Sequence, residues 1–266
     1  MTKSSDALAV SGKEEPEDEG NAAQSFTFDE VMEALRAETD RLMPDNALLE
    51  GAKAGDYAKV IEALANGARK TAVDNDGNTA VHLAVISGNR DIVQFMLGRE
   101  FAADLANKSG FTPLSYAVAG KYAEIAGDLA AAGANVNHAI SGLKETLLMI
   151  AAYRDIPELV ETLLKSGARV DEKDSNGVTA FMRAAGQGNL DCLRSLMDAG
   201  ADPYLKSDTG NTAFAFAKRT GGAQAVECLN AYLTEYMERV ARVGSAKPVS
   251  TMKTISLKKT EYIPHG

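Results

Sequence analysis

The chain has 266 residues, of which 45% are hydrophobic and 24% charged, and its formal net charge is −9. This length can hold one large domain or two small ones, and the hydrophobic share can form a substantial core, which excludes a wholly disordered chain. The acidic balance disfavours binding to a phosphate backbone, and two cysteines are too few for a disulfide framework.

The first 44 residues are predicted to form two segments ahead of the main body. Residues 1–24 are acidic, rich in Gly, Ser, Ala and Glu, and without hydrophobic periodicity, so we predict a disordered N-terminal tail. A helix is predicted over 25–44, because Thr27 and Glu30 have the spacing of a capping box and Pro44 is expected to end it. We expect this helix to cap the open end of the segment that follows, with a partner-binding helix as the alternative.

Two sequence markers recur through the middle of the chain with one period. Threonines that follow a glycine stand 33, 34, 33 and 33 residues apart, at Thr79, Thr112, Thr146, Thr179 and Thr212. Gly-Ala pairs begin at Gly67, Gly133, Gly167 and Gly200. A shared period of about 33 residues predicts an array of structural repeats.

Each unit has the pattern of a turn, a short helix, a second turn and a longer helix. In the second unit a turn at Asp76–Gly77 precedes Thr79, whose hydroxyl can cap the first helix. The second helix carries an apolar stripe from Ile92 to Leu97, and a glycine after such helices supplies the left-handed conformation that ends them. Neither helix can bury its stripe alone, so neighbouring units are expected to stack.

This pattern resembles the ankyrin repeat family over roughly 45–237. The second, third and fifth units read TAVHLA, TPLSYA and TAFMRAA at their first helices. The resemblance implies an all-α ankyrin-repeat solenoid of about six helix-turn-helix repeats with short β-turn fingers, a flanking helix at the N-terminus and an extended last helix. The implied repeats are 45–75, 76–108, 109–140, 141–174, 175–207 and 208–244.

Three positions in the repeats are distinctive. Glu100 stands where the other units have glycine, so a left-handed backbone there would cost about 1–2 kcal/mol. The segment Ser141–Thr146 places two extra residues between glycine and threonine, which predicts a longer finger in the fourth repeat. His82 occupies the family's histidine position, and the resemblance implies a structural hydrogen bond between units there.

The last helix is predicted to continue beyond the sixth repeat to Val243, with Gly244 ending it. Residues 245–266 are rich in Ser, Thr and Lys, and we predict a basic, flexible C-terminal tail. The alternative is a short linear motif in this tail that pairs with a strand edge or an acidic surface.

No group of reactive side chains emerges from the sequence. His82, His138 and His265 fall in a helix start, a finger and the tail, which predicts neither a base–nucleophile pair nor a set of metal ligands. We therefore expect no cofactor, no metal and no enzymatic activity, and we expect Cys192 and Cys228 to be two buried, small apolar side chains. With no signal segment and no apolar run of membrane-spanning length, the chain is predicted to be cytoplasmic and monomeric by itself.

In the ankyrin family the finger tips and the exposed side of each first helix form a concave face that usually binds proteins. Phe111, Tyr153 and Arg154 are hot-spot candidates on this face, because aromatic and arginine side chains dominate interface energies. The alternative is that Tyr153 packs on its neighbouring repeat and Phe111 caps a finger. The positions carried onto this sequence, called the partner-binding face below, are Asn75, Asp76, Asn78, Ile86, Lys108, Phe111, Lys144, Glu145, Tyr153, Arg154, Val178, Gln187, Asn211 and Arg219.

The resemblance thus implies a non-enzymatic protein–protein interaction module: an adaptor, scaffold or regulator that binds another protein, whose identity the sequence does not give. One alternative is a bacterial secreted effector that binds a host protein and uses the C-terminal tail as an export or docking signal. The other is weak electrostatic association of the basic tail with nucleic acid or a membrane surface.

Overall fold

The computed structural model describes residues 43–140 and 142–243. The chain divides into two compact units, Met1–Met43 and Pro44–Gly266, so the described residues belong to the second unit apart from Met43. The two predicted tails and nearly all of the predicted helix over 25–44 lie outside the described residues.

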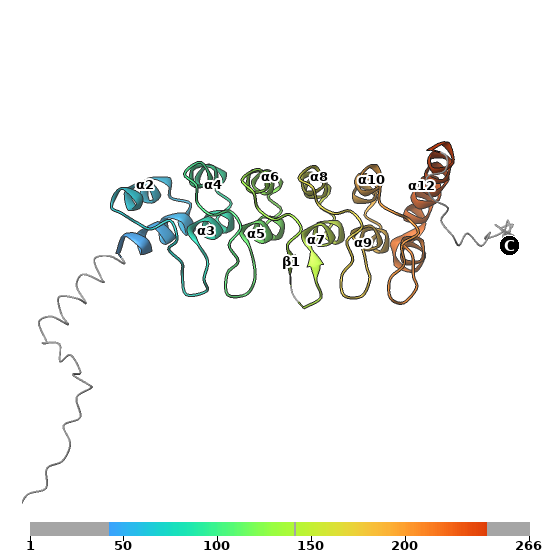
Figure 1. The fold of residues 1–266 in the computed structure, drawn as a ribbon, viewed down its shortest axis with the longest axis horizontal. Helices are drawn as coiled ribbons and strands as arrows, with labels where there is room; N and C mark the ends of the chain where they lie inside the picture. The colour runs from blue at the N-terminus through green and yellow to red at the C-terminus, as the bar shows by residue number, and fades with distance from the viewer. Residues whose placement is uncertain (1–42, 141, 244–266) are drawn as a thin grey trace, which may run out of the picture. The chain divides into compact units, whose positions relative to one another are not determined.

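Six helix pairs follow one another in the described part of the chain (Figure 1). The first pair is a helix over 43–54 followed by α2 (Tyr57–Ala65). The next four pairs are α3 (Ala80–Ile86) with α4 (Arg90–Leu97), α5 (Pro113–Ala119) with α6 (Ala123–Ala131), α7 (Leu147–Tyr153) with α8 (Pro157–Lys165), and α9 (Ala180–Gln187) with α10 (Leu190–Asp198). The last comprises α11 (Ala213–Phe216), the π-helix η1 (Ala217–Gly221) and α12 (Gly222–Val243). The predicted all-α repeat array with an extended last helix is confirmed.

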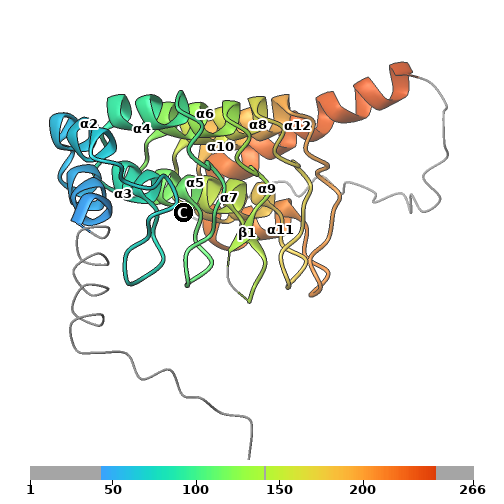
Figure 2. The ribbon, with the colours of Figure 1, turned by 60° about the vertical axis from the view of Figure 1, so that its left-hand side comes forward.

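The helices form two rows within this unit. The first helices of successive repeats, α3, α5, α7, α9 and α11, contact one another in sequence and are called the inner helices. The second helices, α2, α4, α6, α8, α10 and α12, form the other row and are called the outer helices. The fingers that join consecutive repeats all project from the side of the inner row (Figures 1 and 2).

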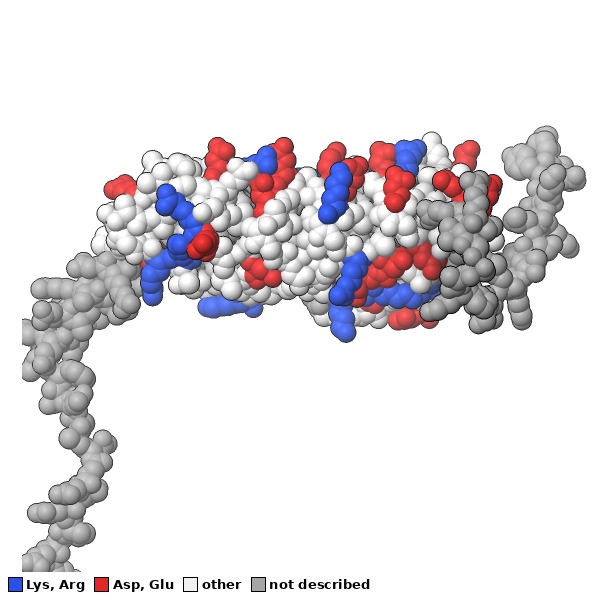
Figure 3. All heavy atoms as spheres, turned by 45° about the horizontal axis from the view of Figure 1, so that its top comes forward, with Lys and Arg blue, Asp and Glu red and all other residues white. Residues whose placement is uncertain are grey.

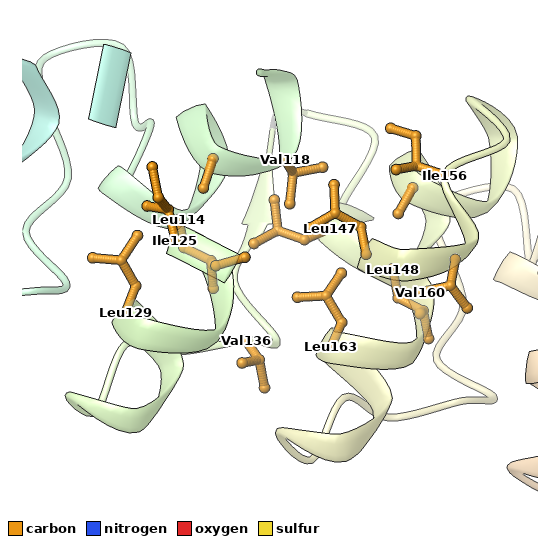
Figure 4. Close-up of a cluster of buried hydrophobic side chains, with 14 of the residues drawn as sticks. Leu114, Val118, Ile125, Leu129, Val136, Leu147, Leu148, Ile156, Val160 and Leu163 are labelled. Atoms are coloured by element: carbon orange, nitrogen blue, oxygen red, sulfur yellow. The ribbon is translucent and has the colours of Figure 1, made fainter. Parts of the chain in front are cut away.

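Burial of apolar side chains between repeats holds the rows together. Figure 4 shows one such cluster, to which α5 contributes Leu114, α6 contributes Leu129, α7 contributes Leu147 and α8 contributes Leu163. All four leucines are fully buried. Because full burial of a leucine side chain contributes about 1.5–3 kcal/mol, and each repeat supplies only part of every cluster, a repeat needs its neighbours to stay folded.

The threonine at the start of each inner helix acts as the predicted cap in four repeats. The hydroxyls of Thr79, Thr112, Thr146 and Thr179 each accept a hydrogen bond from the backbone N–H three residues later. Thr212 makes no such side-chain bond at the start of α11. The caps fix where each finger ends and each inner helix begins.

Glu100 keeps the left-handed conformation for which a strain was expected, with φ 63°, where the equivalent Gly67 and Gly133 have φ 90° and 93°. We therefore expect Glu100→Gly to raise the free energy of unfolding by about 1 kcal/mol, because glycine removes the left-handed penalty but adds freedom to the unfolded chain. Urea denaturation followed by circular dichroism measures the change. The reciprocal variant Gly133→Ala should lose about 1 kcal/mol, since no atom lies near its added Cβ and only the backbone conformation is penalised. Equal free energies of unfolding for the natural chain and the two variants would contradict the idea that the left-handed backbone at these positions favours glycine.

Residues 43–54 are helical and include Pro44. Leu48, Leu49 and Ala52 of this helix are buried against the rest of the array. Because the residues before Met43 lie outside the described part of the chain, the predicted helix end at Pro44 stays a prediction.

The finger of the fourth repeat is longer than that of the second by one residue, so the predicted longer finger is confirmed. Its strands β1 (Ala139–Ile140) and β2 (Glu145–Thr146) pair antiparallel, with Ala139 opposite Thr146, whereas Val73 faces Thr79 in the second repeat. The left-handed residue of this turn is Lys144, at φ 54°, not Gly142. The two extra residues between Gly142 and Thr146 therefore lengthen the finger by one residue, because the left-handed position moves from glycine to Lys144.

Candidate functional site

A polar side chain, half-buried at Asp74 and buried at Asn107 and Asp174, organises each of three fingers. The Oδ1 atom of Asp74 accepts hydrogen bonds from the backbone N–H groups of Asp76 and Asn78, at 2.9 and 2.8 Å. Asn107 and Asp174 do the same in their own fingers. Sequence reasoning missed these residues, although an Asp or Asn five residues before the capping threonine is a signal for such a turn.

Backbone hydrogen bonds join three pairs of neighbouring fingers. Lys108 N–H donates to the carbonyl of Asp76 at 3.0 Å, and Asp208 N–H donates to that of Asn176 at 3.0 Å. Ser175 N–H likewise donates to the carbonyl of Leu143 at 2.8 Å. The finger tips are therefore positioned by their neighbours as well as by their own turns.

His82 links the second and third repeats. Its Nδ1 accepts from the backbone N–H of Thr79 at 3.1 Å, so Nε2 carries the proton and donates to the carbonyl of Phe111 at 3.1 Å. Burial lowers the pKa of His82, because the interior disfavours the charged imidazolium. The implied hydrogen bond between units is confirmed, and the neutral side chain has a structural use.

An ion-pair network connects the fourth and fifth repeats. Nη2 of Arg183, on α9, lies 2.7 Å from Oδ2 of Asp174 and 2.5 Å from Oε1 of Glu145. The Asp174 side chain is fully buried, and the side chains of Arg183 and Glu145 are 20% and 26% exposed. Glu145 belongs to the predicted partner-binding face, but here its carboxylate already has a partner within the chain.

Exposed side chains lie at the ends of the inner helices. Ile86 ends α3 and Tyr153 ends α7, and these side chains are 43% and 50% exposed. Arg154 follows Tyr153, is exposed, and its Nη1 donates to the carbonyl of Ala119 at the end of α5. Gln187 and Arg219 are exposed at the corresponding ends in the fifth and sixth repeats.

Other predicted face residues differ in their accessibility. Asn75, Asp76, Lys108 and Lys144 are exposed at finger tips, whereas Val178 and Asn211 are half-buried. The prediction that Asn78 is displayed is wrong: it is 6% exposed, because it bonds to both Asp74 and Asn107.

The three hot-spot candidates do not form one group. Phe111 is half-buried beside the ring of Tyr116, with the ring centroids 5.9 Å apart, and lies just before the start of α5. Tyr153 and Arg154 lie at the far end of an inner helix, and a seven-residue helix is about 10 Å long. The structure therefore keeps the Tyr153–Arg154 pair together and places Phe111 apart from it.

Leu143 is an exposed apolar residue that sequence reasoning overlooked. Its side chain is 49% exposed in the fourth finger, at a position where the other fingers have Asp76, Ser109, Asn176 and Thr209. An apolar residue among polar equivalents was the available signal. Because buried apolar contacts drive association, Leu143 extends the candidate surface onto the finger.

Charge differs between the two rows of helices. Figure 3 shows Asp and Glu side chains gathered along the outer helices, with few Lys and Arg among them. On the predicted partner-binding face, Lys108, Lys144, Arg154 and Arg219 are exposed cations, whereas Asp76 is its one fully exposed acid. Although the net charge of the whole chain is negative, the exposed charged residues of the predicted partner-binding face are mostly positive.

The described residues offer no assembled reactive centre. No three His, Cys, Asp or Glu side chains within 43–140 and 142–243 group as metal ligands, and no helix in these ranges has the length and hydropathy of a membrane span. Burial, followed by the neighbouring Asp155 carboxylate, raises the pKa of the Cys192 thiol to about 12. Cys192 is buried as expected, but Cys228 is only half-buried, so the expectation for the second cysteine is corrected.

Matches to known proteins agree with this architecture. The family model described as ankyrin repeats, in three copies, matches residues 48–140, 129–207 and 148–238. The chain belongs to the ankyrin repeat family. Ankyrin repeats are protein–protein interaction modules, so the coarse expectation of a protein-binding chain is confirmed.

Similar ankyrin proteins come from distant organisms. A putative ankyrin repeat-containing protein of Treponema pallidum is 37% identical over 134 residues, which are 50% of this chain and 45% of that protein. The ankyrin repeat and KH domain-containing protein mask-1 of Caenorhabditis elegans is 30% identical over 156 residues, which are 58% of this chain and 6% of that protein. The chain therefore spans less than half the length of these relatives.

Two solved structures are similar to this chain over nearly their whole length. A chain from the complex of the Bd0816 predatory endopeptidase from Bdellovibrio bacteriovorus with immunity protein Bd3460 is 32% identical, with a TM-score of 0.63, over 70% of this chain and 97% of that one. The ankyrin repeat protein EF0377 is 28% identical, with a TM-score of 0.64, over 72% of this chain and 98% of that one.

Proposed function

We propose that this chain is a non-enzymatic, cytoplasmic adaptor or regulator that binds a partner protein on its finger tips and inner-helix ends. The observation that carries the proposal is the exposed Tyr153–Arg154 pair, held at the end of α7 between repeats on both sides. Fingers joined by backbone hydrogen bonds present a preorganised surface next to it, and preorganisation lowers the entropy lost on binding.

The chemistry of this surface favours a partner with apolar and acidic groups. Ile86, Leu143 and Tyr153 supply exposed apolar contacts, and Lys108 and Arg154 supply exposed positive charge. Such a combination suits an interface with a small apolar centre and a charged rim.

The test begins by identifying partners through in-cell crosslinking and mass spectrometry, with crosslinks expected on Lys108 and Lys144. The double substitution Tyr153→Ala with Arg154→Ala should then weaken partner binding by about 2 kcal/mol or more, a loss of roughly 30-fold in affinity. Calorimetric titration of the identified partner measures this change. The melting curve should stay nearly unchanged, because both side chains are exposed.

The matched control is Ile61→Ala, on the outer helix α2, where the isoleucine is 42% exposed. This variant should bind the partner as tightly as the natural protein. Equal weakening by both variants, or no weakening by the double substitution, would contradict the assignment of the binding surface.

A second candidate is that the partner is a peptidase. The observation favouring it is the match to a chain in an endopeptidase–immunity protein complex, at 32% identity over 97% of that chain. Size-exclusion chromatography with endopeptidases of the source organism would reveal a stable complex, and inhibition of peptide hydrolysis would give it a function. Without either result the adaptor proposal alone remains.

A further inference from the structure

A groove of about 700 Å³ lies between α10 and α12, on the outer side of the last two repeats. Its lining includes Leu190, Met197, Cys228 and Tyr232, which give it an apolar floor. The direction of α12 departs from the one that the preceding outer helices share (Figure 1), so the two helices diverge here.

The rim of the groove is acidic. Asp198, Glu227 and Glu235 line it and are exposed, and within 43–140 and 142–243 none of the three has an ion pair. The cation on the rim, Arg194, lies 2.7 Å from Asp191 and is already balanced by that carboxylate. An apolar floor with an acidic rim fits a basic segment that also carries apolar side chains.

We propose that this groove binds the chain's own C-terminal segment, residues 244–266. This segment has four lysines against one glutamate, and three aliphatic side chains are spaced among the lysines. The residues concerned are Lys247, Val249, Lys253, Ile255, Leu257, Lys258, Lys259 and Glu261. The groove is separate from the proposed partner-binding face, so the inference does not rest on the proposed function.

The length of the segment allows it to return along α12. From Val243 back to Gln224, at the far end of the groove, α12 extends for about 29 Å at 1.5 Å per residue. The 23 residues after Val243 can span about 75 Å when extended. Several residues thus remain for a reversal of direction before roughly nine extended residues run along the groove. The bound segment would cover the outer side of the last repeat, as terminal repeats require.

Cys228 provides a reporter for occupation of the groove. Cys228 lines the groove and is half-buried, whereas Cys192 is buried and its raised pKa keeps it protonated, so Cys192 should not react under native conditions. Alkylation of the full chain with iodoacetamide, followed by peptide mass spectrometry, gives the rate at Cys228. Replacing the four lysines by glutamate (K247E, K253E, K258E and K259E) should raise this rate about fivefold or more, because a site occupied most of the time is exposed only in its minor state.

The matched control replaces the same lysines by arginine, which keeps the charge and should leave the alkylation rate unchanged. Raising the salt concentration to about 0.5 M should accelerate alkylation of the natural chain, because salt screens the attraction. This second measurement needs no variant, so it also guards against misfolding of a substituted chain. Equal rates for the natural and glutamate chains, together with no effect of salt, would overturn the proposal.

Protein concentration distinguishes the segment from a second copy of the chain. Intramolecular binding predicts the same alkylation rate from about 1 to 100 μM protein. Protection that grows with concentration would assign the groove to a neighbouring molecule and would also overturn the proposal.

Discussion

Substituting Met for Arg183 is expected to lower the free energy of unfolding by about 2–3 kcal/mol, because it leaves the carboxylate of Asp174 buried without its cation. The methionine keeps much of the volume and the apolar stem, so the loss reports on charge rather than on a cavity. Chemical denaturation followed by circular dichroism measures the change.

The expected magnitude follows from the degree of burial. Losing one partner of a fully buried pair typically costs about 3–5 kcal/mol. Arg183 is 20% exposed, and its buried Nε has no hydrogen-bond partner among the described residues, so its removal also relieves part of a desolvation penalty. Because of both features, we expect the loss in the free energy of unfolding to be smaller than the about 3–5 kcal/mol typical of a fully buried pair.

Two comparisons isolate the buried charge as the cause. Arg194→Met, in the same repeat, removes a pair whose side chains are 61% and 69% exposed and should lose less than about 1 kcal/mol. Asp174→Asn combined with Arg183→Met should recover part of the loss, since Asn107 shows that an asparagine can organise a finger at this position. If Arg194→Met lowered the free energy of unfolding more than Arg183→Met, burial would not determine how much these ion pairs stabilise the fold.

The features that could be predicted from the sequence are local and periodic. A threonine caps an inner helix through its own backbone neighbours, and Glu100 takes a left-handed conformation because the position in the turn demands it. Each of these signals lies within a few residues and recurs about every 33 residues, so the repeats confirm one another. The stacking of helix pairs then follows from their unburied stripes.

The features that could not be predicted depend on contacts between repeats. Asn78 is polar and lies in a turn, which suggests exposure, but it is buried where Asn107 of the next finger donates a hydrogen bond to it. Arg183 occupies a position where other inner helices have Leu83, Tyr116 or Ile150, and its use depends on a carboxylate from the preceding finger. Single-sequence patterns do not state which side chains meet across a repeat boundary. The sequence therefore predicts where the candidate residues lie within each repeat, but it does not predict how accessible their side chains are.

Gly221→Ala is expected to lower the stability of the sixth repeat by about 3 kcal/mol, because the added Cβ would lie 1.9 Å from the carbonyl oxygen of Ala185. This oxygen belongs to the backbone of α9 and cannot rotate away. The π-helix η1 brings Gly221 this close to α9, where the hydroxyl of Thr220 also donates to the carbonyl of Gly186 at 2.6 Å. Hydrogen exchange resolved by mass spectrometry should show faster exchange in α11, η1 and α12.

The loss should remain local, because a terminal repeat contacts only one neighbour and can unfold while the others keep their interfaces. Peptides from α3 to α8 should therefore exchange at unchanged rates, and thermal unfolding should gain an early phase. Gly127→Ala, inside α6, is the matched control: its added Cβ meets only Thr162 at an ordinary 3.5 Å, so it should stabilise by up to about 1 kcal/mol. Uniform destabilisation of all repeats by Gly221→Ala would mean that the array unfolds as one cooperative unit, and the nearest-neighbour account of its stability would fail.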